Sequence, residues 1–280
     1  MRRLVVNADD FGLSALVNDG IAEAVGAGVV TSVSVMVNTP GFDDAMHRVP
    51  SLSPRTSVGL HFNLTTGLPV CPAAEVPSLV DGAGRLLSLG ALVRRALAGR
   101  VRADEVRREA SAQLARLRSG GVEPTHADSH RHVHALPAIR GGLAAAAASA
   151  GVRAVRRPLE PLWARPVNAA ALAKRASLAA AWAVPSGSAR PRPGTTAFRG
   201  LALLGVRRYA EDLLVLLDAL PAGSTELMVH PGRDDPSVAA WDPYVAERAV
   251  ELAALLSAPV RERLGRGDVR LGPIGDARAP

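Results

Sequence analysis

Short apolar runs alternate with helical segments from one end of the chain to the other. Runs of strand length and composition are RRLVVNADD, VVTSVSVMVN, SVGLHFNLT, PTHADSHRHVH, GVRAVRRP, TELMVHPG and VRLGPIG. Segments with helical spacing lie between them, at 13–28, 40–49, 90–119, 137–150, 209–220 and 242–257. This alternation predicts parallel strands joined by helices, an α/β fold. About seven such units favour a distorted (β/α) TIM-like barrel with mostly parallel strands.

A doubly wound open sheet is the alternative architecture. No G-x-G-x-x-G or Walker loop follows the first apolar run to support it. No change in composition separates two domains, so we expect a single domain over 1–280. Within it, 155–222 is expected to be a variable insertion, and its Gly-, Pro- and Arg-rich part, 185–200, is a candidate lid.

Four of the seven histidines fall within nine residues, in the stretch HADSHRHVH. In an extended chain, side chains two residues apart project to the same side. His126, Asp128, His130, His132 and His134 would then share one face of a strand. A solvent-facing loop has no use for such a row, whereas a metal or acid–base site at the end of a strand does.

Polar residues also end three other apolar runs. Asp9 and Asp10 close the first run, His61 and Asn63 lie late in the third, and His230 closes TELMVHPG. Because the carboxyl ends of barrel strands meet at one mouth, these groups are expected to converge in space. Taken singly, each has a structural explanation: turn chemistry for the aspartates and His230, and a hydrogen-bonded core position for His61.

One carboxylate with two imidazoles is a ligand set for Zn²⁺ or a similar divalent ion, with positions left open for water. Residues two apart on a strand lie roughly 6.5 Å from each other, so neighbouring histidines of the cluster compete for one ion. We therefore expect one histidine of the cluster to be a ligand. Its neighbours would orient ligands or touch substrate.

The formal net charge of +7 raises the question of nucleic-acid binding. The basic residues are nearly all arginine and are interleaved with acids, as in RRALAGRVRADEVRREA, which is typical of a solvated helix face. No nucleic-acid or membrane partner is therefore expected. A single cysteine, Cys71, excludes an intrachain disulfide. With no signal peptide or membrane span recognised, a cytoplasmic location and a possible homodimer are the expectations.

The motifs VNADDFGLS, GLHFNLT, PTHADSHRHVH and ELMVHPG, in this order and spacing, resemble those of the YdjC-type carbohydrate deacetylases. That group includes the bacterial chitooligosaccharide deacetylases. The resemblance covers 3–135 well and 224–275 more loosely. It implies a distorted βα barrel that binds one divalent metal ion per chain, Mg²⁺ or Zn²⁺, and removes the acetyl group from N-acetylated amino sugars.

Mapped by motif, the resemblance implies that Asp10, His61 and His130 hold the metal. It further implies that Asp9 is the catalytic base and that His230 is the acid.

Asn63 and His132 are candidate substrate contacts. Arg131 stands inside the cluster where a relative could carry histidine, which leaves the ligand His130 unaffected.

Two other functions remain open at this point. A phosphoesterase or amidohydrolase on a similar barrel would use a comparable metal site, although such barrels often place a His-x-His pair on the first strand. A carbohydrate- or metal-binding protein without turnover is the other alternative.

Overall fold

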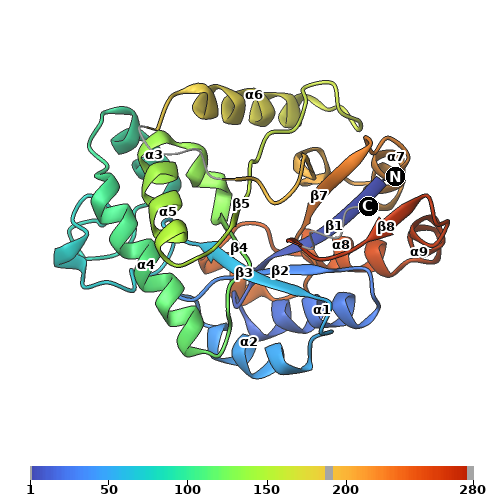
Figure 1. Cartoon of the computed structure of the whole chain (residues 1–280), viewed down its shortest axis with the longest axis horizontal. Coiled ribbons are helices and arrows are strands. Elements are labelled where there is room, and N and C mark those ends of the chain that lie inside the picture. The colour runs from blue at the N-terminus through green and yellow to red at the C-terminus, as the bar shows by residue number, and fades with distance from the viewer. Residues whose placement is uncertain (1, 187–191, 276–280) are drawn as a thin grey trace.

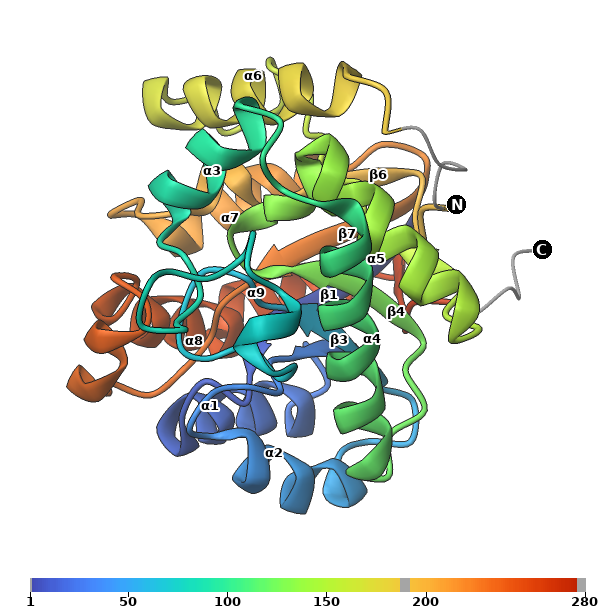
Figure 2. The ribbon, with the colours of Figure 1, turned by 90° about the vertical axis from the view of Figure 1, so that its left-hand side faces the viewer.

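The strands of the chain form one curled sheet with helices packed around it (Figures 1 and 2). The computed structural model describes residues 2–186 and 192–275. Within these ranges the strands are β1 (Arg2–Phe11), β2 (Ser32–Val35), β3 (Ser57–Phe62), β4 (His126–Ser129), β5 (Ala154–Val155), β6 (Ala197–Arg199), β7 (Gly223–Val229) and β8 (Val269–Leu271). The helices are α1 (Ala15–Gly26), α2 (Phe42–Arg48), α3 (Leu89–Leu97), α4 (Ala103–Ser119), α5 (Pro137–Ser149), α6 (Ala169–Ala183), α7 (Tyr209–Asp218), α8 (Ala246–Leu256) and α9 (Ala258–Leu264).

All pairings between the named strands are parallel, which confirms the predicted α/β class. The strand order is β5-β4-β3-β2-β1-β7-β6, with β8 paired to the start of β1. The result is a curled half-barrel, consistent with a distorted TIM-like barrel. Its edge strands β5 and β6 are not paired with each other in the described part of the chain. The Val155 amide of β5 instead donates to the carbonyl of Arg192, which precedes β6, at 2.9 Å.

Strand β1 lies inside the sheet, between β2 and β7, and is buried on both faces. Leu4, Val5 and Val6 are all buried, as expected for a strand of a parallel sheet that is covered on both sides. The same strand then buries Asp9 and Asp10. Buried carboxylates need charged or hydrogen-bonding partners, so the carboxyl end of β1 must be a built polar site.

The connection from β1 to α1 is tight. Gly12 has a φ of +101°, and a Cβ atom there would lie 2.4 Å from the Met36 carbonyl oxygen. Only glycine fits such a position. Helix α1 then begins after an N-terminal cap, in which the Ser14 hydroxyl accepts from the Val17 amide at 3.2 Å.

Two predicted elements are shorter than expected. The helix expected over 90–119 is two helices, α3 and α4, because the chain turns at Gly99 with a φ of +67°. The strand expected over 124–134 ends at Ser129 and continues as a 3₁₀ segment, His130–Ala135. The prediction of five side chains on one face was therefore wrong, because Arg131 and His132 adopt left-handed backbone angles that redirect the chain.

The segment 155–222 contributes α6, β6 and α7 to the fold. Helix α6 lies across the top of the molecule in both views (Figures 1 and 2). That 155–222 varies among relatives stays a prediction. The lid at 185–200 also stays a prediction, and 187–191 of it lie outside the described residues. None of the described helices is long and apolar enough to cross a membrane.

Candidate active site

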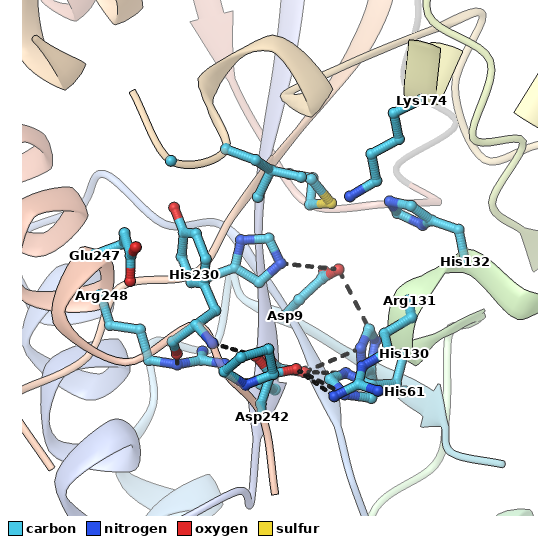
Figure 3. Close-up of a pocket in the computed structure, with 16 residues that line it drawn as sticks. Asp9, His61, His130, Arg131, His132, Lys174, His230, Asp242, Glu247 and Arg248 are labelled. Atoms are coloured by element: carbon cyan, nitrogen blue, oxygen red, sulfur yellow. Dashed lines mark hydrogen bonds and ion pairs between the residues drawn. The ribbon is translucent and has the colours of Figure 1, made fainter. Parts of the chain in front are cut away.

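A cavity of about 330 Å³ opens at the carboxyl ends of the strands. Its wall includes six of the seven residues singled out from the sequence, which are Asp9, Asp10, His61, His130, His132 and His230 (Figure 3). They come from segments up to 221 positions apart in the chain, between Asp9 and His230. The expected convergence of polar strand ends is confirmed for these six.

The three predicted metal ligands meet at one oxygen atom. Asp10 Oδ1 lies 3.2 Å from His61 Nε2 and 2.9 Å from His130 Nδ1. The potential ligand atoms of the three residues all lie within 4.8 Å of one another, and all three side chains are buried. Asp10 has a φ of +67°, a strained conformation for a residue other than glycine and a recurrent feature of functional sites.

Each of the two imidazoles has its other nitrogen against a carboxylate. His61 Nδ1 lies 2.5 Å from Asp128 Oδ1, and His130 Nε2 lies 3.0 Å from Asp242 Oδ2. Carboxylates in this position fix the tautomer and ring orientation of metal-binding histidines. The donor set and its supporting carboxylates therefore fit a divalent cation, and Asp10, His61 and His130 could hold one.

The electrostatics of the same site favour a positive charge at its centre. Burial would lower the pKa of His61, but the carboxylates of Asp128 and Asp9 raise it to about 10. Burial would raise the pKa of Asp10, but Arg248 and His130 hold it well below its ordinary value. Carboxylates that stabilise an imidazolium would equally stabilise a metal ion between them.

Asp9 forms a bidentate salt bridge with a buried arginine, Arg156. Both oxygens of Asp9 accept from Arg156 at 2.6 Å, and Oδ1 also accepts from the Asn7 amide at 2.7 Å. The same guanidinium lies 2.7 Å from Asp128 and from Glu226. Such a bidentate pair fixes the orientation of the Asp9 carboxylate.

His230 faces Asp9 from the side opposite the histidine pair (Figure 3). Its Nε2 atom lies 4.0 Å from Asp9 Oδ2, and its Nδ1 atom lies 3.6 Å from Glu251 Oε1. The position directly after β7 brings the ring to the cavity. The site thus holds a carboxylate and an imidazole in addition to the three potential ligands.

The chain's single lysine, Lys174, also reaches this cavity, from α6. Burial lowers its pKa to about 8, and among the described residues no carboxylate forms a salt bridge with its ammonium. His132 lies beside it and packs on Phe198, with the two ring centroids 5.7 Å apart. Together they form a mixed polar and aromatic wall suited to contacting a ligand (Figure 3).

Asn63 is the one predicted site residue that the structure places elsewhere. Its side chain donates to Asn38 Oδ1 and to the Thr66 carbonyl and accepts from the Thr65 amide, so it shapes the loop after β3. It is fully buried and does not line the cavity. Its amide is thus committed to the protein.

The other two histidines of the cluster are satisfied inside the protein. His126 contacts the hydroxyls of Thr125 and Ser34, at 2.8 and 3.1 Å. His134 contacts the Ser129 hydroxyl at 2.5 Å and the Arg156 carbonyl oxygen at 3.0 Å. Burial lowers the pKa of each ring to about 4. Neither lines the cavity.

Sequence reasoning missed Arg156, Lys174, Asp242 and Glu251. Arg156 directly follows a strand, so the rule that found His230 could also have found it. Lys174 and Glu251 lie on helices, and Asp242 lies in a loop, where charged residues are ordinary. No local signal distinguishes those three.

The fold and site define a class of protein, an α/β barrel with a buried aspartate–histidine centre and a second aspartate and histidine that face each other beside it. The chain matches the model of the YdjC-like protein family over residues 3–266 and belongs to that family. This confirms the resemblance found in the motifs.

Named relatives match along nearly the whole chain. A carbohydrate deacetylase of Mus musculus is 36% identical, with 98% of this chain and 94% of that protein covered. A chitooligosaccharide deacetylase of Klebsiella pneumoniae (strain 342) is 34% identical, with 98% and 99% covered. A crystal structure from Enterococcus faecalis V583, of a protein whose suggested role is cellobiose-phosphate cleavage, superposes with a TM-score of 0.78. It is 27% identical, with 98% and 97% of the two chains covered.

Proposed function

We propose that this protein is a metal-dependent hydrolase that removes the acetyl group from N-acetylated amino sugars, such as chitooligosaccharides or related glycoconjugates, and releases acetate. The observation that carries the proposal is one cavity in which Asp10, His61 and His130 meet while Asp9 and His230 face each other beside them. Relatives named carbohydrate deacetylase and chitooligosaccharide deacetylase support the sugar amide as substrate.

One divalent ion per chain, Zn²⁺ or Mg²⁺, would be held by Asp10, His61 and His130. Two imidazoles and one carboxylate favour zinc on ligand softness. A divalent ion at these residues supplies a Lewis acid that polarises the acyl carbonyl and lowers the pKa of water. Asp128 and Asp242 keep the two imidazoles oriented for it.

Asp9 is the base in this proposal. The two hydrogen bonds from Arg156 fix the orientation of this carboxylate, so that it can take a proton from the attacking water. His230 is the acid, because its Nε2 atom faces the cavity and an amine leaves only when its nitrogen is protonated. His132 and Lys174 are placed to contact the sugar.

Acetate release tests the proposal directly. Protein stripped of metal is reloaded with Zn²⁺, Mg²⁺, Mn²⁺ or Co²⁺ and given N-acetylglucosamine oligomers and glycoconjugates. Asp9→Asn and His130→Ala are assayed beside the wild type, with His47→Ala, an exposed histidine of α2, as the matched control. The expected result is metal-dependent release that is lost in both site variants and retained in the control.

Three other results would change or overturn the proposal. Metal bound without acetate release, together with phosphate release from sugar phosphates, would indicate a phosphoesterase at the same site. Metal bound with no product from any substrate would indicate a binding protein. No bound metal in any preparation would overturn the proposal.

A further inference from the structure

Glu251 of α8 is a buried carboxylate with a nearly complete set of donors. Its Oε2 atom accepts from the His230 backbone amide at 2.7 Å and from the Tyr209 hydroxyl at 2.8 Å. Its Oε1 atom accepts from the Tyr244 hydroxyl at 2.5 Å. Only 1% of the residue is exposed. Three donors from separate segments therefore hold this carboxylate in one place.

The side chain of His230 points its two nitrogens at different partners. Nδ1 is buried without a hydrogen-bond partner among the described residues, and Glu251 Oε1 lies 3.6 Å away. Nε2 is directed toward Asp9, 4.0 Å away, on the cavity side (Figure 3). The ring also packs on Tyr244, with centroids 5.4 Å apart.

We propose that Glu251 is a positioning residue that keeps a proton on Nδ1 of His230 and so reserves Nε2 for proton exchange with the substrate. This inference rests on the proposed function, in which His230 is the acid. An ionised carboxylate only accepts hydrogen bonds, so the nearby Nδ1 is stabilised as a donor. A neutral imidazole has one N–H, and its Nε2 atom is then left with a free lone pair.

The proton balance of the step follows from this arrangement. The imidazolium gives the proton on Nε2 to the amine nitrogen as the bond between that nitrogen and the acyl carbon breaks. The neutral ring retains its single proton on Nδ1, facing Glu251. Solvent returns a proton to Nε2 for the next turnover.

The two tyrosines have a supporting part in this arrangement. Burial would raise the pKa of Glu251, but its hydrogen bonds with His230 and Tyr244 lower it. Tyr209 belongs to α7 and Tyr244 to the loop before α8, so packing of these segments sets the carboxylate before any substrate arrives. A preorganised partner of this kind costs no rearrangement during the reaction.

Imidazole NMR of the zinc-loaded protein tests the inference without any substrate. In protein labelled with ¹⁵N-histidine, the His230 ring is assigned by comparison with His230→Gln. The expected wild-type tautomer carries hydrogen on Nδ1. In Glu251→Gln, whose amide can donate to Nδ1, the tautomer with hydrogen on Nε2 becomes populated, and Glu251→Asp restores the original form in part. Glu262→Gln, an exposed glutamate of α9, is the matched control.

Kinetics provide the second readout. Glu251→Gln is expected to lower kcat about 10²-fold, the size of a general-acid contribution, with KM changed less than about twofold. In the His230→Gln background the same substitution is expected to cause no further loss. A purely structural role would instead lower activity in both backgrounds.

Each result has a defined meaning. A wild-type His230 with hydrogen on Nε2, or a tautomer unchanged in Glu251→Gln, would overturn the inference, and the wild-type spectrum gives the first answer even if the variant fails to fold. The expected tautomers with no deacetylation of any sugar would leave the inference standing and count against the proposed function alone.

Discussion

Replacing Arg156 with methionine removes the one cation shared by Asp9, Asp128 and Glu226. All three carboxylates lie within 2.7 Å of the guanidinium, which is 3% exposed. Removing one partner of a buried ion pair typically costs about 3–5 kcal/mol, because the remaining charge stays uncompensated. Asp128 would still contact His61, so the expected loss in unfolding free energy is near the lower limit, about 3 kcal/mol.

The sign of the pH dependence follows from Glu226. Burial raises its pKa to about 7, against an ordinary value of 4.5, so the folded state binds this proton more tightly than the unfolded state. The corresponding stability is present below pH 4.5 and is lost as the pH rises through 7. Without Arg156 the carboxylates repel more strongly, and the defect of the variant is expected to grow from pH 5 to pH 8.

Urea unfolding followed by circular dichroism at both pH values measures this effect in metal-loaded protein. Arg157→Met is the matched control, because Arg157 is the next residue and is exposed, and its expected effect is within about 0.5 kcal/mol. A loss below about 1 kcal/mol for Arg156→Met, or a defect that does not grow with pH, would refute the view that this arginine neutralises the cluster.

Metal binding at pH 7 is expected to release about one proton, because carboxylates raise the pKa of His61 to about 10 and the metal must displace that proton. Calorimetry in two buffers of different ionisation enthalpy measures the number of protons released. Zero release would contradict the assignment of His61 as a metal ligand. Lys174→Met is expected to raise KM several-fold with little change in kcat. In the wild type KM should rise above pH 8, because the pKa of Lys174 is about 8 and the ammonium loses its charge there; a KM that is flat to pH 9 would argue against contact with substrate. His134 has a folded pKa of about 4 against an ordinary value of 6.5, so the stability it contributes is present above pH 6.5 and lost as the pH falls through 4. This loss amounts to about 3 kcal/mol, and unfolding of His134→Asn should show a correspondingly smaller loss between pH 7 and pH 4.

The sequence predicted the strands well where burial on both faces leaves an apolar run. The run before Asp9 is such a case, and the rule that parallel strands end at one face predicts that Asp10, His61 and His230 lie together, as they do. The rule failed where backbone angles depart from the regular ones. His132 reaches the cavity through a left-handed turn, which the sequence HRHVH does not predict.

The sequence could not predict which side chains from helices and loops lie at the candidate site, and the reason is physical. Glu251 and Lys174 lie in segments where a charged residue is ordinarily solvated. Their positions depend on how α8 and α6 pack against the sheet, which is a property of the folded chain. Asn63 shows the opposite error. It was predicted to contact substrate because it is a polar residue near the end of a strand, but its side chain forms hydrogen bonds within the following loop.

Three histidines that line the cavity are oriented in the same way, by a carboxylate beside one ring nitrogen. His61, His130 and His230 each turn one ring nitrogen toward a carboxylate, on Asp128, Asp242 and Glu251 respectively.

What distinguishes the rings is the atom that the inner nitrogen faces. For His61 and His130 it is the same oxygen of Asp10, at 3.2 and 2.9 Å, and a cation is stabilised best where three ligand atoms meet. For His230 it is Asp9 at 4.0 Å, a carboxylate already neutralised by Arg156. The same supported imidazole therefore suits a metal ligand at two positions and a proton donor at the third.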